Sequence, residues 1–167
     1  MKSIGIFYGA TTGTTEQVAM EIAEALGVAE ADVHDVTKSA PSEVGAYDVL
    51  LFGASTWGDG DLQDDMQDFL NGVCEIYLGG KYVGVFGCGD ETMSDTFCNG
   101  VGQMYGQLVK TGATMIGQYN ADGYDFSKSE AVSDGHAVGL LIDNVNHENL
   151  TPKKISEWTA EIKRQIA

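Results

Sequence analysis

The chain has 167 residues, of which 43% are hydrophobic, and its 25 acidic and nine basic residues give a formal charge of -16. This length fits one α/β domain spanning residues 1–167, and the negative charge excludes nucleic acids and anionic membranes as partners because both attract basic surfaces. No apolar run approaches the ~20 residues of a membrane span, nor does one form the core of a signal peptide, so we expect a cytoplasmic protein.

Apolar runs rich in β-branched residues alternate with helical patterns along the chain, which is typical of a parallel sheet covered on both faces. The expected strands are, in chain order, Ser3–Tyr8, Asp32–Val36, Tyr47–Ala54, Tyr82–Gly87 and Thr114–Gln118. Apolar residues at helical spacing predict helices over Val18–Leu26, Met66–Val73, Val101–Leu108 and Ile155–Ile166. The pattern therefore predicts a doubly wound, five-stranded parallel sheet.

The fifth strand is interrupted. After Gln118 the pattern breaks into a long polar stretch, Tyr119–His136, and apolar β character resumes over Ala137–Ile142. A loop of this length inside a compact domain is either functional or an insertion. We expect one strand that is split around an insertion.

The turn after the first strand has the composition of a phosphate site. It reads Tyr8-Gly9-Ala10-Thr11-Thr12-Gly13-Thr14-Thr15-Glu16 and places hydroxyls and helix N-terminal N–H groups together without Lys or Arg. A triphosphatase loop needs Gly-Lys-Ser/Thr and a dinucleotide loop needs G-x-G-x-x-G, and neither is present. The turn predicts a phosphomonoester site, although an ordinary strand-to-helix turn would fit this stretch alone.

Two further glycine-rich loops should meet this turn. In a sheet of order 2-1-3-4-5 the ligand binds beyond the carboxyl ends of the first and third strands. The third strand leads into Ser55-Thr56-Trp57-Gly58-Asp59-Gly60-Asp61, and the fourth leads into the loop from Gly87 to Phe97. Trp57 at a loop tip suits a planar ligand, with packing on its own domain as the alternative. The peptide after Gly58 can turn with little strain, so the three features together indicate FMN.

With these motifs in order, the chain resembles the flavodoxins, and specifically their long-chain subgroup. The phosphate turn matches the family's T/S-x-T-G-x-T motif, Thr56–Gly60 its flavin-stacking loop, and Gly87-x-Gly89-Asp90 its third loop. Asp122–Phe126 with Gly139-Leu140-x-x-Asp143 resembles the insertion that divides the fifth strand in long-chain members.

The resemblance implies a monomeric one-electron carrier that shuttles non-covalently bound FMN between semiquinone and hydroquinone. Its partners would be a flavin-containing NADPH reductase and a low-potential acceptor enzyme. The implied FMN-binding residues are Ala10, Thr11, Thr12, Gly13, Thr14, Thr15, Thr56, Trp57, Gly58, Asp59, Gly60, Cys88, Gly89, Asp90, Met93, Asp95 and Thr96. The alternative is an FMN-dependent quinone reductase of the same fold.

Three residues depart from the family pattern. Ala10 stands where the family usually has Ser or Thr, which removes one hydroxyl from the phosphate site. Met93 stands near the place of a Tyr that covers the second flavin face, and a thioether can still pack on a ring. Val145 stands where some relatives have an acidic residue.

The loops offer no enzyme chemistry. They contain no His, and we interpret Cys88 as a small apolar residue rather than a reactive thiolate. The cysteines and histidines are too widely spaced to predict a disulfide or a metal site: Cys74, Cys88, Cys98, His34, His136 and His147.

Acidic residues are concentrated in the middle of the chain. From Ser39 to Val109 there are eleven acidic residues and one basic residue, Lys81. This segment is either a solvated face or a docking surface for a basic partner.

Overall fold

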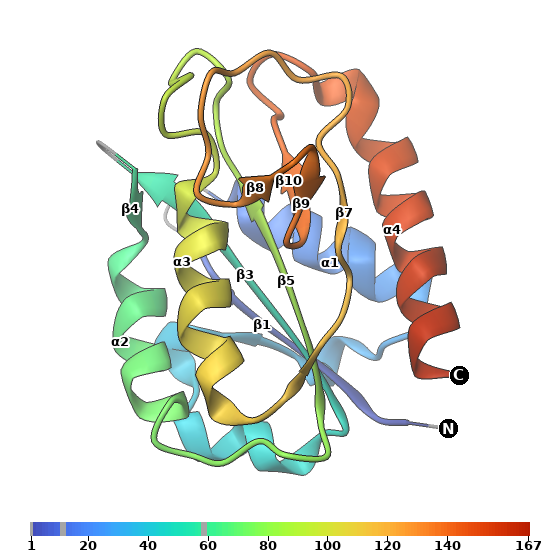
Figure 1. Ribbon diagram of the computed structural model, residues 1–167. Coiled ribbons are helices and arrows are strands. Elements are labelled where there is room, and N and C mark those ends of the chain that lie inside the picture. Colours follow the sequence, from blue (N-terminus) through green and yellow to red (C-terminus); the bar gives the residue numbers. More distant parts are fainter. Residues whose placement is uncertain (1, 11–12, 58–59) are drawn as a thin grey trace.

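The computed structural model describes residues 2–10, 13–57 and 60–167, with Trp57 described by its backbone alone (Figure 1). Its centre is a parallel sheet in the order β2-β1-β3-β5-β10. These strands are β1 (Ile4–Gly9), β2 (Val33–Asp35), β3 (Val49–Trp57), β5 (Tyr82–Cys88) and β10 (Leu140–Ile142). The predicted doubly wound order is confirmed, and individual strands begin or end up to three residues from the predicted bounds.

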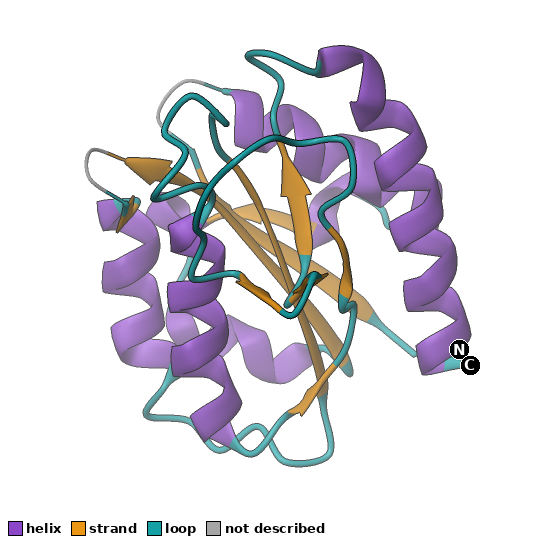
Figure 2. Cartoon of the chain, turned by 45° about the horizontal axis from the view of Figure 1, so that its top comes forward, coloured by secondary structure: helices purple, strands orange, loops and turns teal. Residues whose placement is uncertain are grey.

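Helices cover both faces of the sheet, as the sequence predicted (Figure 2). They are α1 (Thr14–Leu26), α2 (Asp64–Val73), α3 (Asn99–Leu108) and α4 (Thr151–Ile166). Helices α1 and α4 bury their apolar residues on one face of the sheet, and α2 and α3 bury theirs on the other. No helix in the described part of the chain has the length and apolar character needed to cross a membrane.

Short 3-10 helices connect these elements. They are η1 (Glu30–Asp32), η2 (Val36–Lys38), η3 (Pro41–Ala46), η4 (Val109–Thr111) and η5 (Glu148–Leu150). Strand β4 (Asp61–Leu62) turns back and pairs antiparallel with the end of β3, so that Thr56 faces Leu62. The end of β3 therefore forms a short hairpin at the edge of the sheet.

The fifth strand position is filled by two separate segments. Strand β6 (Thr114–Met115) pairs with the beginning of β5 at Tyr82 and Val83. Strand β10 pairs with the end of β5, from Phe86 to Cys88. Both pairings are parallel and lie on the same side of β5, which confirms the predicted split.

The first of these segments ends earlier than the predicted Gln118. Gly117 adopts a left-handed backbone with φ of 81° and turns the chain away from the sheet. Its carbonyl accepts a hydrogen bond from Nε1 of Trp158 at 2.7 Å, and its N–H donates to Oε1 of Gln165 at 2.8 Å. Side chains of α4 thus satisfy the backbone groups that a longer strand would have paired.

The insertion between β6 and β10 forms a small antiparallel sheet of its own, in the order β7-β9-β8. Its strands are β7 (Tyr119–Asn120), β8 (Val132–Ser133) and β9 (His136–Ala137). Ala137 therefore belongs to this sheet, and not to the resumed fifth strand that the sequence predicted. A Cβ on Gly139 would lie 2.0 Å from the carbonyl oxygen of Val85, so glycine lets the returning chain approach β5.

Candidate functional site

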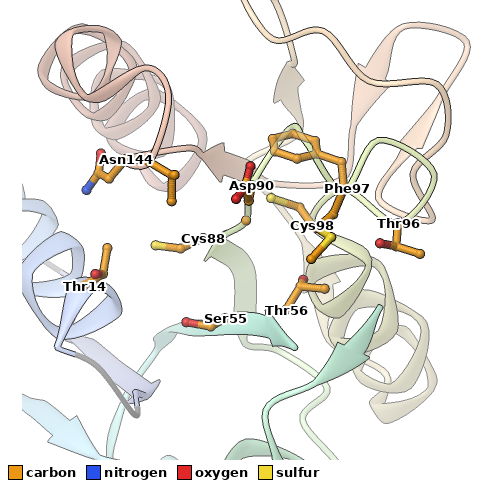
Figure 3. A pocket seen from close by; sticks show the side chains of 12 residues that line it. Thr14, Ser55, Thr56, Cys88, Asp90, Thr96, Phe97, Cys98 and Asn144 are labelled. Atoms are coloured by element: carbon orange, nitrogen blue, oxygen red, sulfur yellow. The ribbon is translucent and has the colours of Figure 1, made fainter. Parts of the chain in front are cut away.

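A cavity of about 320 Å³ opens at the edge of the sheet where β3, β5 and β10 end (Figure 3). The start of α1 and the loops after these strands enclose it. The described residues that line it are Thr14, Ser55, Thr56, Cys88, Gly89, Asp90, Met93, Thr96, Phe97, Cys98, Asn144 and Val145. Its volume lies within the range of small-molecule sites, and its place is the one at which a doubly wound sheet binds ligands.

The first turn of α1 reaches the cavity. Gly13 is the N-cap and has a left-handed φ of 88°, and a glycine offers no side chain to cap the turn. The N–H groups of a first helical turn have no partners within the helix, so they are open to an anionic ligand or water. Thr14 lines the cavity, while Thr15 is buried behind it with its hydroxyl 2.8 Å from that of Ser55.

Only some of the other residues of the predicted phosphate turn are among the described residues. Ala10 is half-buried and packs against the core cluster under α1 and α4. Thr11 and Thr12 lie outside the described residues. The structure thus brings the helix end of the turn to the cavity and leaves the two central threonines as a sequence prediction.

The end of β3, in the β3–β4 hairpin, forms the next part of the cavity through Ser55 and Thr56. Oγ1 of Thr56 accepts a hydrogen bond from the backbone N–H of Gly100 at 2.9 Å, which ties the end of β3 to α3. Gly60 is buried and has a φ of 99°, a backbone that favours glycine. The Trp57 side chain and residues 58–59 lie outside the described residues, so the predicted roles of Trp57, Gly58 and Asp59 remain predictions.

The loop after β5 contributes most of the predicted residues. The backbone N–H of Gly89 donates to the carbonyl of Ile142 at 2.9 Å, and a Cβ on Gly89 would lie 2.7 Å from Sγ of Cys98. Met93 lines the cavity with 55% of its surface exposed. Thr96 lines it as well, whereas Asp95 is exposed and is not part of the described lining.

Asp90 is the one carboxyl group among the described lining residues. Its Oδ1 accepts from the Thr92 N–H at 2.9 Å and from Nδ2 of Asn146 at 2.8 Å. The hydrogen bonds from Thr92 lower the pKa of Asp90, because they stabilise the ionised form. Asp90 therefore stays negatively charged at neutral pH and does not donate a proton.

A buried carboxylate joins the loops after β5 and β10. Oδ2 of Asp143 accepts from the Glu91 N–H at 3.0 Å and from Nδ2 of Asn146 at 2.9 Å. Its Oδ1 accepts from the N–H groups of Val145 and Asn146, both at 2.9 Å. In addition, Nε2 of His147 lies 2.7 Å from Oε1 of Glu91. These contacts fix the two loops that meet across the cavity.

The two thiols of the cavity are chemically inert. Burial raises the pKa of the Cys88 thiol to about 12, and it raises the pKa of Cys98 well above its usual value. Both stay protonated at neutral pH, and a protonated thiol is a weak nucleophile. This supports the interpretation of Cys88 as a small apolar residue.

The described lining is suited to binding rather than to catalysis. It holds no His, Lys or Arg, and its carboxyl is ionised. Met93, Phe97 and Val145 supply apolar surface, while the start of α1 supplies N–H groups at the positive end of a helix dipole. Among the described residues, no three His, Cys, Asp or Glu side chains are grouped to hold a metal ion.

Five lining residues were absent from the predicted site: Ser55, Phe97, Cys98, Asn144 and Val145. Asn144 and Val145 follow β10, so they lie at the same sheet edge as the predicted loops. The sequence analysis selected the loops after the first, third and fourth strands because ligands bind beyond the carboxyl ends of the strands. The same rule would have selected the loop after β10.

The comparisons with known proteins agree with this geometry. A family model described as Flavodoxin matches residues 6–158. Flavodoxin 1 of Escherichia coli is 39% identical over 168 residues, covering 99% of this chain and 96% of the relative. A flavodoxin of Nostoc sp. is 34% identical over 166 residues, covering 99% of this chain and 98% of the relative. The flavodoxin of Fusobacterium nucleatum bound to flavin mononucleotide matches with a TM-score of 0.89 and 32% identity, covering 99% of both chains.

Proposed function

The chain belongs to the flavodoxin family, and from this premise we propose that it passes single electrons by cycling FMN between semiquinone and hydroquinone. It is an FMN-binding electron-transfer protein and not an enzyme. The observation that carries the proposal is the cavity, which combines an uncapped helix N-terminus with apolar walls and no described catalytic group. When bound, FMN supplies one-electron chemistry that the side chains themselves do not provide.

The described residues fit FMN at both ends. The N-cap Gly13 and the first residues of α1, Thr14 and Thr15, would hold the phosphate through N–H groups, and the apolar side chains would pack on the flavin ring. We propose that the site comprises the residues predicted from the sequence: Ala10, Thr11, Thr12, Gly13, Thr14, Thr15, Thr56, Trp57, Gly58, Asp59, Gly60, Cys88, Gly89, Asp90, Met93, Asp95 and Thr96. Asn144 and Val145 complete it from the loop after β10.

We also propose that the chain belongs to the long-chain subgroup. Its support is the split of the fifth strand position between Thr114–Met115 and Leu140–Ile142, with β7, β8 and β9 between them.

The proposed partners are basic-surfaced redox proteins, namely a flavin-containing NADPH reductase as donor and a low-potential acceptor enzyme. The net charge of -16 supports this, because it attracts positively charged surfaces. Among the described residues, five exposed carboxylates lie on the hairpin, on α2 and in the loop after β5: Asp61, Asp64, Asp65, Asp68 and Asp95. We propose that the carrier works as a monomer in the cytoplasm.

The test is a redox titration of the purified protein. The protein should be yellow, should release one FMN on acid precipitation, and should be reduced in two separate one-electron steps. A single two-electron step would contradict the proposed cycling. Steady oxidation of NAD(P)H by quinone with the protein alone would contradict the role of a carrier.

A further inference from the structure

The side chain of Gln103, on the second turn of α3, forms hydrogen bonds to two separate segments of the chain. Its Nε2 donates to the carbonyl of Gly60 at 2.7 Å and to Oε2 of Glu130 at 3.1 Å. Its Oε1 accepts from the backbone N–H of Leu62 at 3.1 Å. An amide has two N–H donors and two acceptor lone pairs, so Gln103 uses both donors and one acceptor position. One side chain thus connects the β3–β4 hairpin with the insertion.

Helix α3 holds both strands of the hairpin. The N–H of Gly100 bonds to Oγ1 of Thr56 at the end of β3, and Gln103 bonds to Gly60 and Leu62 on the β4 side. Gly60 is packed closely, since a Cβ there would lie 2.8 Å from Nδ2 of Asn99. Because Thr56 lines the cavity, the contacts that fix the hairpin also fix one wall of the proposed site.

The insertion supports α3 from the other side, and in Figure 1 it passes close to the start of that helix. The N–H of Glu130 donates to Oδ1 of Asn99 at 2.8 Å. A Cβ on Gly102 would lie 2.5 Å from the carbonyl carbon and oxygen of Glu130, so glycine permits direct backbone contact. The start of α3 is therefore held between the insertion and the hairpin, and Gln103 bonds to both.

We propose that Gln103 is a positioning residue for FMN, which fixes the β4 side of the hairpin while Glu130 fixes the orientation of its amide. The proposal rests on the proposed function. A glutamine is needed because Gly60 requires a donor and Leu62 requires an acceptor from the same side chain. Leucine at this position leaves both backbone groups without their partner and lets the hairpin shift away from the cavity.

Gln107 provides a matched control. It lies one turn later on α3, is half-buried like Gln103, and forms a reciprocal amide pair with Gln67 of α2 at 2.9 and 3.0 Å. The Gln107→Leu change removes the same chemical group from the same helix and two hydrogen bonds to α2, whereas Gln103→Leu removes two to the hairpin and one to Glu130. Neither Gln107 nor its partner Gln67 is among the described residues that line the cavity.

The experiment compares Gln103→Leu with Gln107→Leu in three measurements: urea unfolding of the apoprotein, titration with FMN, and the midpoint potential of the first one-electron reduction. Both variants should unfold at lower urea concentration than wild type. Gln103→Leu should raise the FMN Kd about tenfold and shift the potential, whereas Gln107→Leu should leave the Kd within about twofold and the potential unchanged. Equal effects of the two variants on Kd and potential would overturn the proposal.

A second set of variants tests the role of Glu130. Gln103→Glu places a carboxylate beside Glu130 and removes the donor to Gly60, so FMN binding should weaken. The double variant Gln103→Glu/Glu130→Gln restores a donor and acceptor pair to the insertion but not to Gly60, so binding should recover in part. No recovery would overturn the role of Glu130, and complete recovery would overturn the role of the Gly60 contact.

The same titrations separate this proposal from the proposed function. Wild-type protein that binds no FMN would contradict the proposed function itself. Wild-type protein that binds FMN, with Gln103→Leu binding it equally well, would contradict the role of Gln103 alone.

Discussion

The Asp143→Asn substitution should destabilise the protein by removing one contact between two loops. Asp143 is fully buried and accepts four hydrogen bonds, two on each carboxylate oxygen. Asparagine can keep its oxygen toward the N–H groups of Val145 and Asn146, which belong to its own loop. Its NH2 group then faces the N–H of Glu91 and Nδ2 of Asn146, and two donors cannot bond to each other.

The size of the effect follows from this geometry. A hydrogen bond to a charged acceptor contributes about 1.5–3 kcal/mol, and an N–H left unpaired away from water adds a desolvation cost. We therefore expect Asp143→Asn to lower the free energy of unfolding by about 2–3 kcal/mol. Asp143→Ala, which leaves all the donors unpaired, should cost about 4 kcal/mol or more. FMN binding should weaken as well, because Glu91 lies in the loop after β5, which also carries Met93.

The assay is urea unfolding of the apoprotein, followed by titration with FMN. Asp48→Asn serves as a control, since Asp48 also accepts from the backbone of a distant residue, with Oδ2 3.1 Å from the Ser3 N–H. Asp48 is exposed and lies outside the cavity lining, so its substitution should cost less stability and leave the FMN Kd unchanged. An Asp143→Asn variant within about 0.5 kcal/mol of wild type would refute the reasoning.

Four further predictions concern FMN and its partners. Ala10→Thr adds a hydroxyl to the proposed phosphate site, so titrations should show FMN binding about fivefold tighter, or about 1 kcal/mol, with riboflavin unchanged. FMN should quench Trp57 fluorescence in the wild-type holoprotein, and Trp57→Ala should weaken FMN binding about tenfold or more; an unchanged Kd and flavin spectrum in that variant would contradict stacking. Gly58→Ala should reduce semiquinone accumulation in a redox titration, because a β-carbon hinders rotation of the following peptide. Neutralising the carboxylates on α2 should raise the semiquinone/hydroquinone potential and flatten the salt dependence of electron transfer. If the potential and the salt dependence are both unchanged, these carboxylates only keep the protein soluble. The variant for that measurement is Asp64→Asn/Asp65→Asn/Asp68→Asn.

The central sheet could be predicted because its signals are local. Each buried strand is a short apolar run, and each helix has an apolar stripe at helical spacing, so periodicity identifies them one by one. The order of strands then follows from the few topologies that such an alternation allows. Periodicity could not predict where the strand that begins at Thr114 ends, because its end depends on contacts of Gly117 with Trp158 and Gln165 of α4.

The hydrogen bonds that hold the loops of the site in place could not be predicted, because they join segments that are distant in the sequence. Gln103 and Glu130 are 27 residues apart, and Glu91 and Asp143 are 52 apart. In the sequence Gln103 is one polar position of an amphipathic helix, with nothing to distinguish it from Gln107. The difference arises when the insertion and the hairpin meet at the start of α3.

The burial of Thr15 could have been predicted from the sequence, because helical geometry explains it. The buried residues of α1 include Val18, Ala19 and Ile22, which lie three, four and seven positions after Thr15. These spacings place Thr15 on the stripe that faces the sheet, where its hydroxyl meets that of Ser55 at the end of β3. This contact ties the first turn of α1 to β3 and leaves Thr14, on the adjacent face, toward the cavity. The rotation of one helix thus decides that the hydroxyl of Thr15 supports the wall of the site while Thr14 faces the ligand.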